Sequence, residues 1–136
     1  GGVYLTVRDE DKDGLVPIAE ELCDLGFTLY ATPGTADVLR AANVEVTTVY
    51  RINERKHPDA LDLMRRGDIS FIVNVPTVSG GAVRDGNMMR RLAVELNIPF
   101  VTTIRGARME TAAIRALIEK DIVPRKLEVH YDSKFL

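Results

Sequence analysis

Several features that mark particular classes of protein are scarce or absent in this sequence. The chain has one cysteine, Cys23, so no disulfide can form within it, which fits a reducing cytosol. No apolar run approaches the length that crosses a membrane, and no charged-then-apolar leader opens the sequence. We therefore predict a cytoplasmic protein with no membrane partner.

An excess of positive charge is also missing. The 18 lysines and arginines are outnumbered by 20 acidic residues, which gives a formal net charge of -2, and the basic residues are dispersed among the acids. Tryptophan is absent and aromatic residues make up 6% of the chain, which leaves few side chains on which bases could stack. A nucleic-acid partner is therefore not expected.

What is present is the length and composition of one globular domain. A chain of 136 residues that is 46% hydrophobic can bury the core of one compact domain and no more. There is no linker, repeat or low-complexity stretch, so we predict a single domain over residues 1–136. The tail, residues 120–136, is compatible with either a short extra strand or a docking arm.

Short apolar runs alternate with longer segments of helical periodicity, five times over. The short runs are rich in β-branched and aromatic residues, and several are apolar on both faces, as in a covered parallel sheet. They span residues 3–7, 28–31, 44–50, 69–75 and 99–103. This alternation predicts an α/β fold with three αβα layers and a five-stranded parallel sheet, because right-handed crossovers place helices on both faces.

The loops that follow the strands carry the unusual residues of the sequence. In parallel sheets, ligands bind beyond the carboxyl ends of the strands, and all five of these loops meet at that edge. The second loop reads "ATPGT" and leads into a helix. An anion there would meet free backbone N–H groups and the positive end of the helix dipole, with Gly34 allowing close approach and Thr32 and Thr35 donating hydrogen bonds. The alternative is an ordinary helix cap by one of the two threonines.

Other loops at the same edge offer further groups for an anion. Lys12 follows the first strand, where it can act as a point charge for phosphate or belong to a solvated run of charges. Arg51, after the third strand, can bind an oxyanion with two parallel hydrogen bonds. Asn74 ends the fourth strand with an amide that both donates and accepts. Thr77 opens the loop 77–81, which could either close over a ligand or simply be mobile.

At these residues the sequence resembles a known family. The motifs are "VR-x-x-DK", "GF-x-L-x-AT-x-GTA", "IVN" before a loop, "RD-x-x-x-x-RR-x-A" and "IP-x-x-TT", in that order along most of the chain. They are similar to those of methylglyoxal-synthase-like domains, specifically the C-terminal allosteric domain of the carbamoyl phosphate synthetase large chain. The resemblance implies the strand order 3-2-1-4-5 and a domain that belongs to a larger chain.

The resemblance also implies roles for the same residues. In nucleotide-regulated members, the positions of Lys12, Thr32 and Thr35 contact the effector phosphate, a lysine stands where this chain has Arg51, and an asparagine matches Asn74. The following residues, "NVPTVSGG", differ from the "NTTSG" of bacterial nucleotide-binding members. They look more like the "N-L-P" of members that bind N-acetylglutamate, although those carry a tryptophan near Tyr50. The implied effector is therefore UMP, IMP or N-acetylglutamate.

Catalysis is a separate question, because methylglyoxal synthase shares this fold and the phosphate-binding residues. Its proton abstraction needs carboxylates and histidines in position. At the matching positions this chain has Arg8, His57, Arg84 and Asn87, of which arginine and asparagine cannot titrate near neutral pH. We expect a regulatory domain with no catalytic residue, metal or cofactor of its own. A free-standing phosphate lyase is the alternative reading, and an inert interaction module is a third.

The implied parent protein is an enzyme of the ligase class. It would make carbamoyl phosphate from bicarbonate, ATP and ammonia, the last from glutamine in most members, for pyrimidine and arginine synthesis. The implied partners are the synthetase domains of the same chain and a glutaminase small subunit.

Overall fold

The protein is a five-stranded parallel sheet between two layers of helices. The computed structural model describes residues 1–78 and 80–120. In chain order the elements are β1 (Gly2–Val7), α1 (Lys12–Asp24), β2 (Thr28–Ala31), α2 (Pro33–Ala41), β3 (Thr47–Thr48), α3 (Ala60–Arg65), β4 (Ile69–Val75), α4 (Gly80–Leu96), β5 (Phe100–Val101) and α5 (Ile104–Glu119). Two short 3-10 turns, η1 (Asp9–Asp11) and η2 (Ile52–Glu54), follow β1 and β3.

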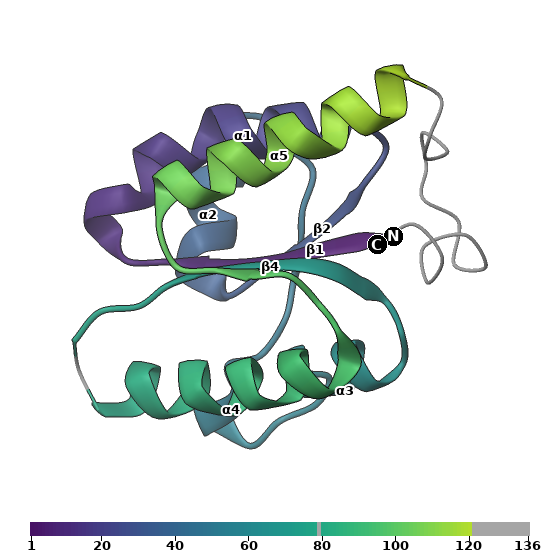
Figure 1. Cartoon of the computed structure of the whole chain (residues 1–136). Helices are drawn as coiled ribbons and strands as arrows, with labels where there is room; N and C mark the ends of the chain where they lie inside the picture. The colour runs from purple at the N-terminus through teal and green to yellow at the C-terminus, as the bar shows by residue number, and fades with distance from the viewer. Residues whose placement is uncertain (79, 121–136) are drawn as a thin grey trace.

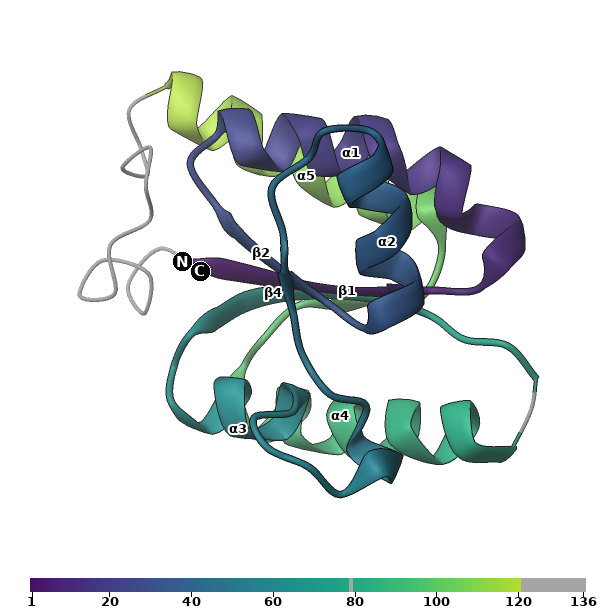
Figure 2. The same cartoon turned by 180° about the vertical axis from the view of Figure 1, so that it is seen from behind.

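The strands lie in the order β3-β2-β1-β4-β5, and every pairing between them is parallel. Figure 1 shows α1, α2 and α5 on one face of the sheet and α3 and α4 on the other, and the view from behind in Figure 2 agrees. The predicted fold class and strand order are thus confirmed. Among the described residues, no helix combines the length and the apolar character needed to span a bilayer.

The central strands are buried on both faces, which explains their unbroken apolar sequences. Side chains alternate across a strand, so the sheet separates two hydrophobic clusters. Val3 and Leu5 of β1 pack with Phe71 under α1, α2 and α5, whereas Tyr4 packs with Ile72 under α3 and α4. Burial on both sides is what fixes β1 and β4 at the centre of the sheet.

The edge strands are shorter than the sequence predicted. The run 44–50 forms a ladder only at Thr47–Thr48, and the run 99–103 only at Phe100–Val101. Val44, Val46 and Val49 are nevertheless buried. The apolar pattern of residues 44–50 therefore reflects burial against the core rather than hydrogen-bonded pairing with a neighbouring strand.

The last helix, α5, begins directly after the run 99–103. Thr103 is the N-cap of α5, and its Oγ1 accepts a hydrogen bond from the Gly106 N–H at 2.9 Å. The predicted loop 77–81 is shortened, because α4 begins at Gly80. The expectation for the tail concerns residues 120–136, of which all but Lys120 lie outside the described residues.

Candidate functional site

A cavity of about 370 Å³ lies at the carboxyl ends of β1, β2 and β4. Six of the seven residues predicted from the sequence line this one cavity: Lys12, Thr32, Thr35, Arg51, Asn74 and Thr77. The seventh, Gly34, lies at its mouth, because a Cβ placed on Gly34 would be 3.7 Å from Lys12 Cε and 3.8 Å from Arg51 Nη2. We call Lys12, Gly34, Thr35 and Arg51 the cradle.

The amino end of α2 faces the cavity. Thr32 is the N-cap residue and Pro33 occupies the first helical position, where its missing N–H costs nothing. The N–H groups of Gly34 and Thr35 follow in the first turn, where a helix provides no partner for them. Because Thr32 and Thr35 line the cavity, the positive end of the helix dipole lies beside it.

The two threonine hydroxyls hold this helix end against β1. Thr32 Oγ1 donates to Thr6 Oγ1 at 3.1 Å and makes no capping bond. Thr35 Oγ1 accepts from the Val7 N–H at 3.2 Å and lies 3.5 Å from the Val7 carbonyl oxygen. Both side chains are buried. Thr32 is thus the N-cap by position, as the capping alternative had it, but neither hydroxyl makes a capping bond and both hold α2 against β1.

Lys12 is held at the cradle by two bonds. Its Nζ donates to the Val7 carbonyl oxygen at 3.1 Å and to Asp9 Oδ1 at 2.5 Å. The Lys12 side chain is 14% exposed, whereas that of Asp9 is 92% exposed. The hydrogen bond from Lys12 lowers the pKa of Asp9. An anion in the cradle would thus meet a fixed ammonium group that already has one exposed carboxylate as partner.

The opposite side of the cavity, which we call the buried wall, consists of Tyr4, Asn74, Asp85 and Met89. Asn74 is 5% exposed and lies close to α4, since a Cβ on Gly86 would be only 2.7 Å from Asn74 Nδ2. Asp85 Oδ2 accepts from the Asn53 N–H at 3.2 Å, and partial burial raises the pKa of Asp85. Burial likewise raises the pKa of Tyr4.

Sequence reasoning missed Tyr4, Asp85 and Asn53 as cavity residues. A tyrosine inside an apolar strand resembles any core residue, and an acid on a helix resembles a solvated charge. The one available signal was the motif "RD-x-x-x-x-RR", whose aspartate is Asp85. No comparable pattern marked Tyr4 or Asn53.

The residues at the catalytic positions of methylglyoxal synthase do not assemble into an acid–base group. Arg8 lines the cavity and pairs with Asp11 at 2.6 Å, which raises the pKa of its guanidinium. Arg84 and Asn87 are exposed on α4. Among the described residues, no histidine lines the cavity.

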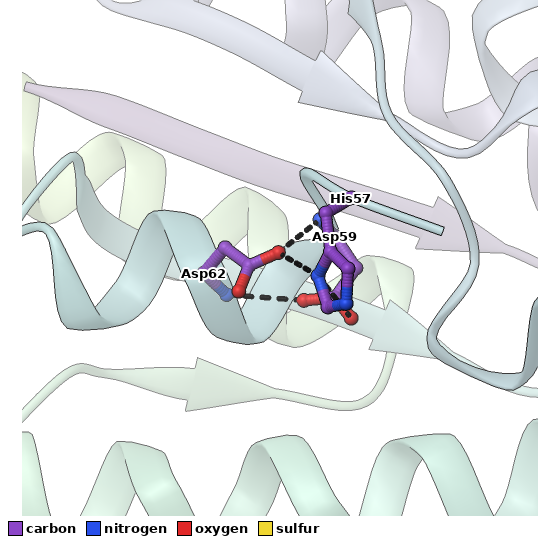
Figure 3. Close-up of side chains that lie close together, drawn as sticks. All are labelled: His57, Asp59 and Asp62. Carbon is purple, nitrogen blue, oxygen red and sulfur yellow. Dashed lines mark hydrogen bonds and ion pairs between the residues drawn. The ribbon is translucent and has the colours of Figure 1, made fainter. Parts of the chain in front are cut away.

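His57 lies instead at the start of α3, beside two aspartates (Figure 3). Asp59 Oδ1 accepts from the Asp62 N–H at 3.0 Å, and Asp62 Oδ2 accepts from the Asp59 N–H at 2.9 Å, a reciprocal capping arrangement. His57 Nδ1 lies 2.6 Å from the same Asp62 oxygen. That contact raises the pKa of His57, while the bonds from the Asp59 N–H and from His57 lower the pKa of Asp62.

The same three side chains bring potential metal-ligand atoms within 4.8 Å of one another. The capping bonds and the His57–Asp62 contact account for this proximity without an ion. We therefore interpret the group as the cap of α3.

Comparisons with known proteins agree with this geometry. A family model described as "MGS-like domain" matches residues 14–102. The carbamoyl phosphate synthase large chain, C-terminal section, of Methanocaldococcus jannaschii is 45% identical over 118 residues, and that of Methanopyrus kandleri is 42% identical over 122 residues. The alignments cover 86% and 90% of this chain but only 19% and 22% of those relatives.

A longer relative and a solved structure are also similar to this chain. The carbamoyl phosphate synthase large chain of Methanobrevibacter smithii is 37% identical over 98% of this chain and 12% of its own length. The crystal structure of ForH has a TM-score of 0.59, covering 98% of this chain and 92% of that chain at 17% identity, which shows the fold alone. Since the family model covers most of the chain and the sheet has the expected order, the chain belongs to the MGS-like domain family.

Proposed function

We propose that this chain is the effector-binding regulatory domain of a carbamoyl phosphate synthase large chain. The effector is a small anion, one of UMP, IMP and N-acetylglutamate, and it binds in the cavity at the carboxyl ends of the strands. The relatives with this name support the assignment to the parent protein. The domain has no catalytic residue, metal or cofactor, and it acts by binding alone.

The main support for this proposal is that the cradle residues come together at one cavity. The first turn of α2, Lys12 and Arg51 come from three separate segments of the chain and surround one cavity. A helix amino end attracts an anion through its unpaired N–H groups, and charge-assisted hydrogen bonds each contribute about 1.5–3 kcal/mol net. Arg51 adds a planar donor pair that fits a phosphate or carboxylate. The cavity volume lies within the usual range for small-molecule sites.

In this proposal the effector regulates the larger enzyme by binding one of its states more tightly than the other. A ligand shifts the equilibrium of a larger enzyme only by the difference in its affinity for two states of that enzyme. In this proposal the parent is an ATP-dependent ligase that uses glutamine or ammonia for pyrimidine and arginine synthesis. Its synthetase domains, in the same chain, and a glutaminase small subunit are the partners that receive the effector signal.

A calorimetric screen of UMP, IMP and N-acetylglutamate against the domain tests the proposal. We expect at least one to bind, and Lys12→Met to weaken that binding about tenfold or more, equal to 1.4 kcal/mol. Arg65→Met removes an exposed charge from α3, away from the cavity, and serves as the matched control. Absence of binding by all three compounds, or an equal loss in both variants, would contradict the proposal.

A further inference from the structure

The hydroxyl of Tyr4 is a buried polar group without a hydrogen-bond partner among the described residues. Tyr4 is 2% exposed, and its ring packs among apolar side chains that include Val49, Met64, Ile72 and Met89. Over residues 1–78 and 80–120, this hydroxyl makes no hydrogen bond. Buried hydroxyls are nearly always paired, so a partner from outside the described chain is required.

The position of Tyr4 shows where that partner lies. Tyr4 and Thr6 share one face of β1, and Tyr4 stands about 7 Å further from the rim, at the rise of a strand. Tyr4 lines the cavity. Because apolar side chains enclose the ring, the hydroxyl is the end that faces the cavity.

Charged groups around the cavity act on the same phenol. The carboxylates of Asp85 and Asp59 raise the pKa of Tyr4, adding to the effect of burial, while the Arg51 guanidinium lowers it. The hydroxyl therefore remains protonated at neutral pH and can donate a hydrogen bond. Asp85, whose carboxylate has the largest of these charge effects and lines the cavity, makes this end less favourable for a second negative charge.

We propose that the Tyr4 hydroxyl donates a hydrogen bond to an uncharged oxygen of the effector, at the end away from the anionic group. This inference rests on the proposed function and deepens it. The ligand class is an anion whose second end is neutral and carries a carbonyl or hydroxyl oxygen. Before binding, water in the cavity can satisfy the hydroxyl, and a ligand that displaces this water must replace its hydrogen bond.

Tyr4→Phe tests the proposal because it removes one oxygen and keeps the ring in place. Binding is measured by calorimetry with UMP and IMP, and by ³¹P NMR titration with inorganic phosphate, which has only the anionic end. We expect Tyr4→Phe to weaken the better nucleotide about three- to tenfold, the range for one neutral hydrogen bond, and to leave phosphate binding unchanged. N-acetylglutamate, which carries a second carboxylate, should bind the unaltered domain more weakly than that nucleotide.

Thermal unfolding of the ligand-free domain supplies a second readout. Since the hydroxyl has no hydrogen-bond partner to lose among the described residues, the unfolding midpoint of Tyr4→Phe should stay within about 2 °C of the unaltered domain or rise. Tyr30→Phe is the matched control, because Tyr30 lies on β2 outside the cavity with its ring beside Gly2. It should leave binding of both probes unchanged.

The possible results test this inference and the proposed function separately. Nucleotide binding that is equal in the unaltered domain and in Tyr4→Phe overturns this inference and leaves the proposed function standing. An equal loss of nucleotide and phosphate affinity, or a clearly lower unfolding midpoint, shows a structural role for the hydroxyl and also overturns it. If N-acetylglutamate binds more tightly than both nucleotides, the inference that the second end of the effector is neutral is wrong. If no probe binds the unaltered domain, the proposed function itself fails.

Discussion

The bond between Lys12 and Asp9 determines which charges an anion meets when it approaches the cradle. The ammonium group is fixed by the Val7 carbonyl oxygen, while its carboxylate partner is almost fully exposed. Such an exposed pair contributes little to folding stability, because water and salt screen it. Its effect on a ligand is larger, because an anion that approaches Lys12 also approaches the negative charge of Asp9.

Replacing Asp9 with asparagine should therefore tighten anion binding. We expect Asp9→Asn to lower the Kd for phosphate or for the bound nucleotide about threefold or more at low salt, and less at high salt. Glu10→Gln removes a neighbouring charge that contacts Arg8 rather than Lys12, and should have a smaller effect. Calorimetric titrations at two salt concentrations provide the comparison, and weaker binding by Asp9→Asn would contradict the expectation.

The His57–Asp62 pair makes the stability of the domain depend on pH. The pKa of His57 is raised above 6.5, so its contribution is complete below that pH and is lost as pH rises through the raised value. The pKa of Asp62 is lowered below 3.8, so its contribution is lost as pH falls through the lowered value. The pair therefore stabilises the fold between about pH 4 and 6.5.

An NMR titration of His57 checks this dependence directly. In the unaltered domain its pKa should exceed 6.5, and in Asp62→Asn, which keeps an oxygen for the capping bond, it should return toward 6.5. Asp37→Asn, on the exposed side of α2, should leave the value unchanged. A His57 pKa at or below 6.5 in the unaltered domain would show that the contact in Figure 3 does not form in solution.

At the scale of elements, the close approach of α4 to β4 shapes the buried wall. A Cβ at position 86 would lie 2.7 Å from Asn74 Nδ2, so a larger residue there would require the Asn74 side chain or α4 to shift. Asn74 is paired in register with Thr6, which in turn accepts the hydrogen bond from Thr32. We therefore expect a shift of α4 that moves Asn74 to affect Thr6 and, through it, the amino end of α2.

Gly86→Ala should disturb both stability and binding. We expect a loss of about 1–3 kcal/mol in the free energy of unfolding, as for overpacked cores, because either α4 or Asn74 must move. Gly80→Ala is the matched control on the same helix, since the nearest atom to its Cβ would be 3.7 Å away. Denaturant unfolding of the two variants measures the difference, and equal stability would contradict the close approach.

At the scale of the whole molecule, we expect the fold to bind an anion without catalysing proton abstraction. Arg8, Arg84 and Asn87 replace groups that a methylglyoxal synthase would need to titrate, and within the described chain no histidine reaches the cavity. Binding and chemistry are separable because the cradle and the proton-transfer groups are different residues.

The purified domain should therefore not convert dihydroxyacetone phosphate to methylglyoxal. The product is measured against a reaction without protein and against the Lys12→Met variant. Turnover above the background that Lys12→Met abolishes would favour the lyase alternative over the regulatory domain.

The architecture and the meeting of the loops followed from the sequence by itself. Runs that are apolar on both faces, separated by helical segments, have one stable arrangement, a parallel sheet with helices on both sides. Since parallel strands end at one edge, Lys12, Thr32, Thr35, Arg51 and Asn74 were predicted to meet there, and the structure brings them to one cavity. The lengths of the edge strands could not be predicted from the sequence, because Val44 and Val46 are buried without pairing with β2.

Only the tertiary structure decided what each of these side chains contacts. The bonds of Thr35 to Val7 and of Thr32 to Thr6 depend on the register between β1 and β2, which no local pattern encodes. The phenol of Tyr4 faces a cavity rather than a closed core because of how α4 and the segment after β3 pack over β1. These distances are set by the packing of elements that are far apart in the chain, so they arise from the fold as a whole and not from any segment of the sequence.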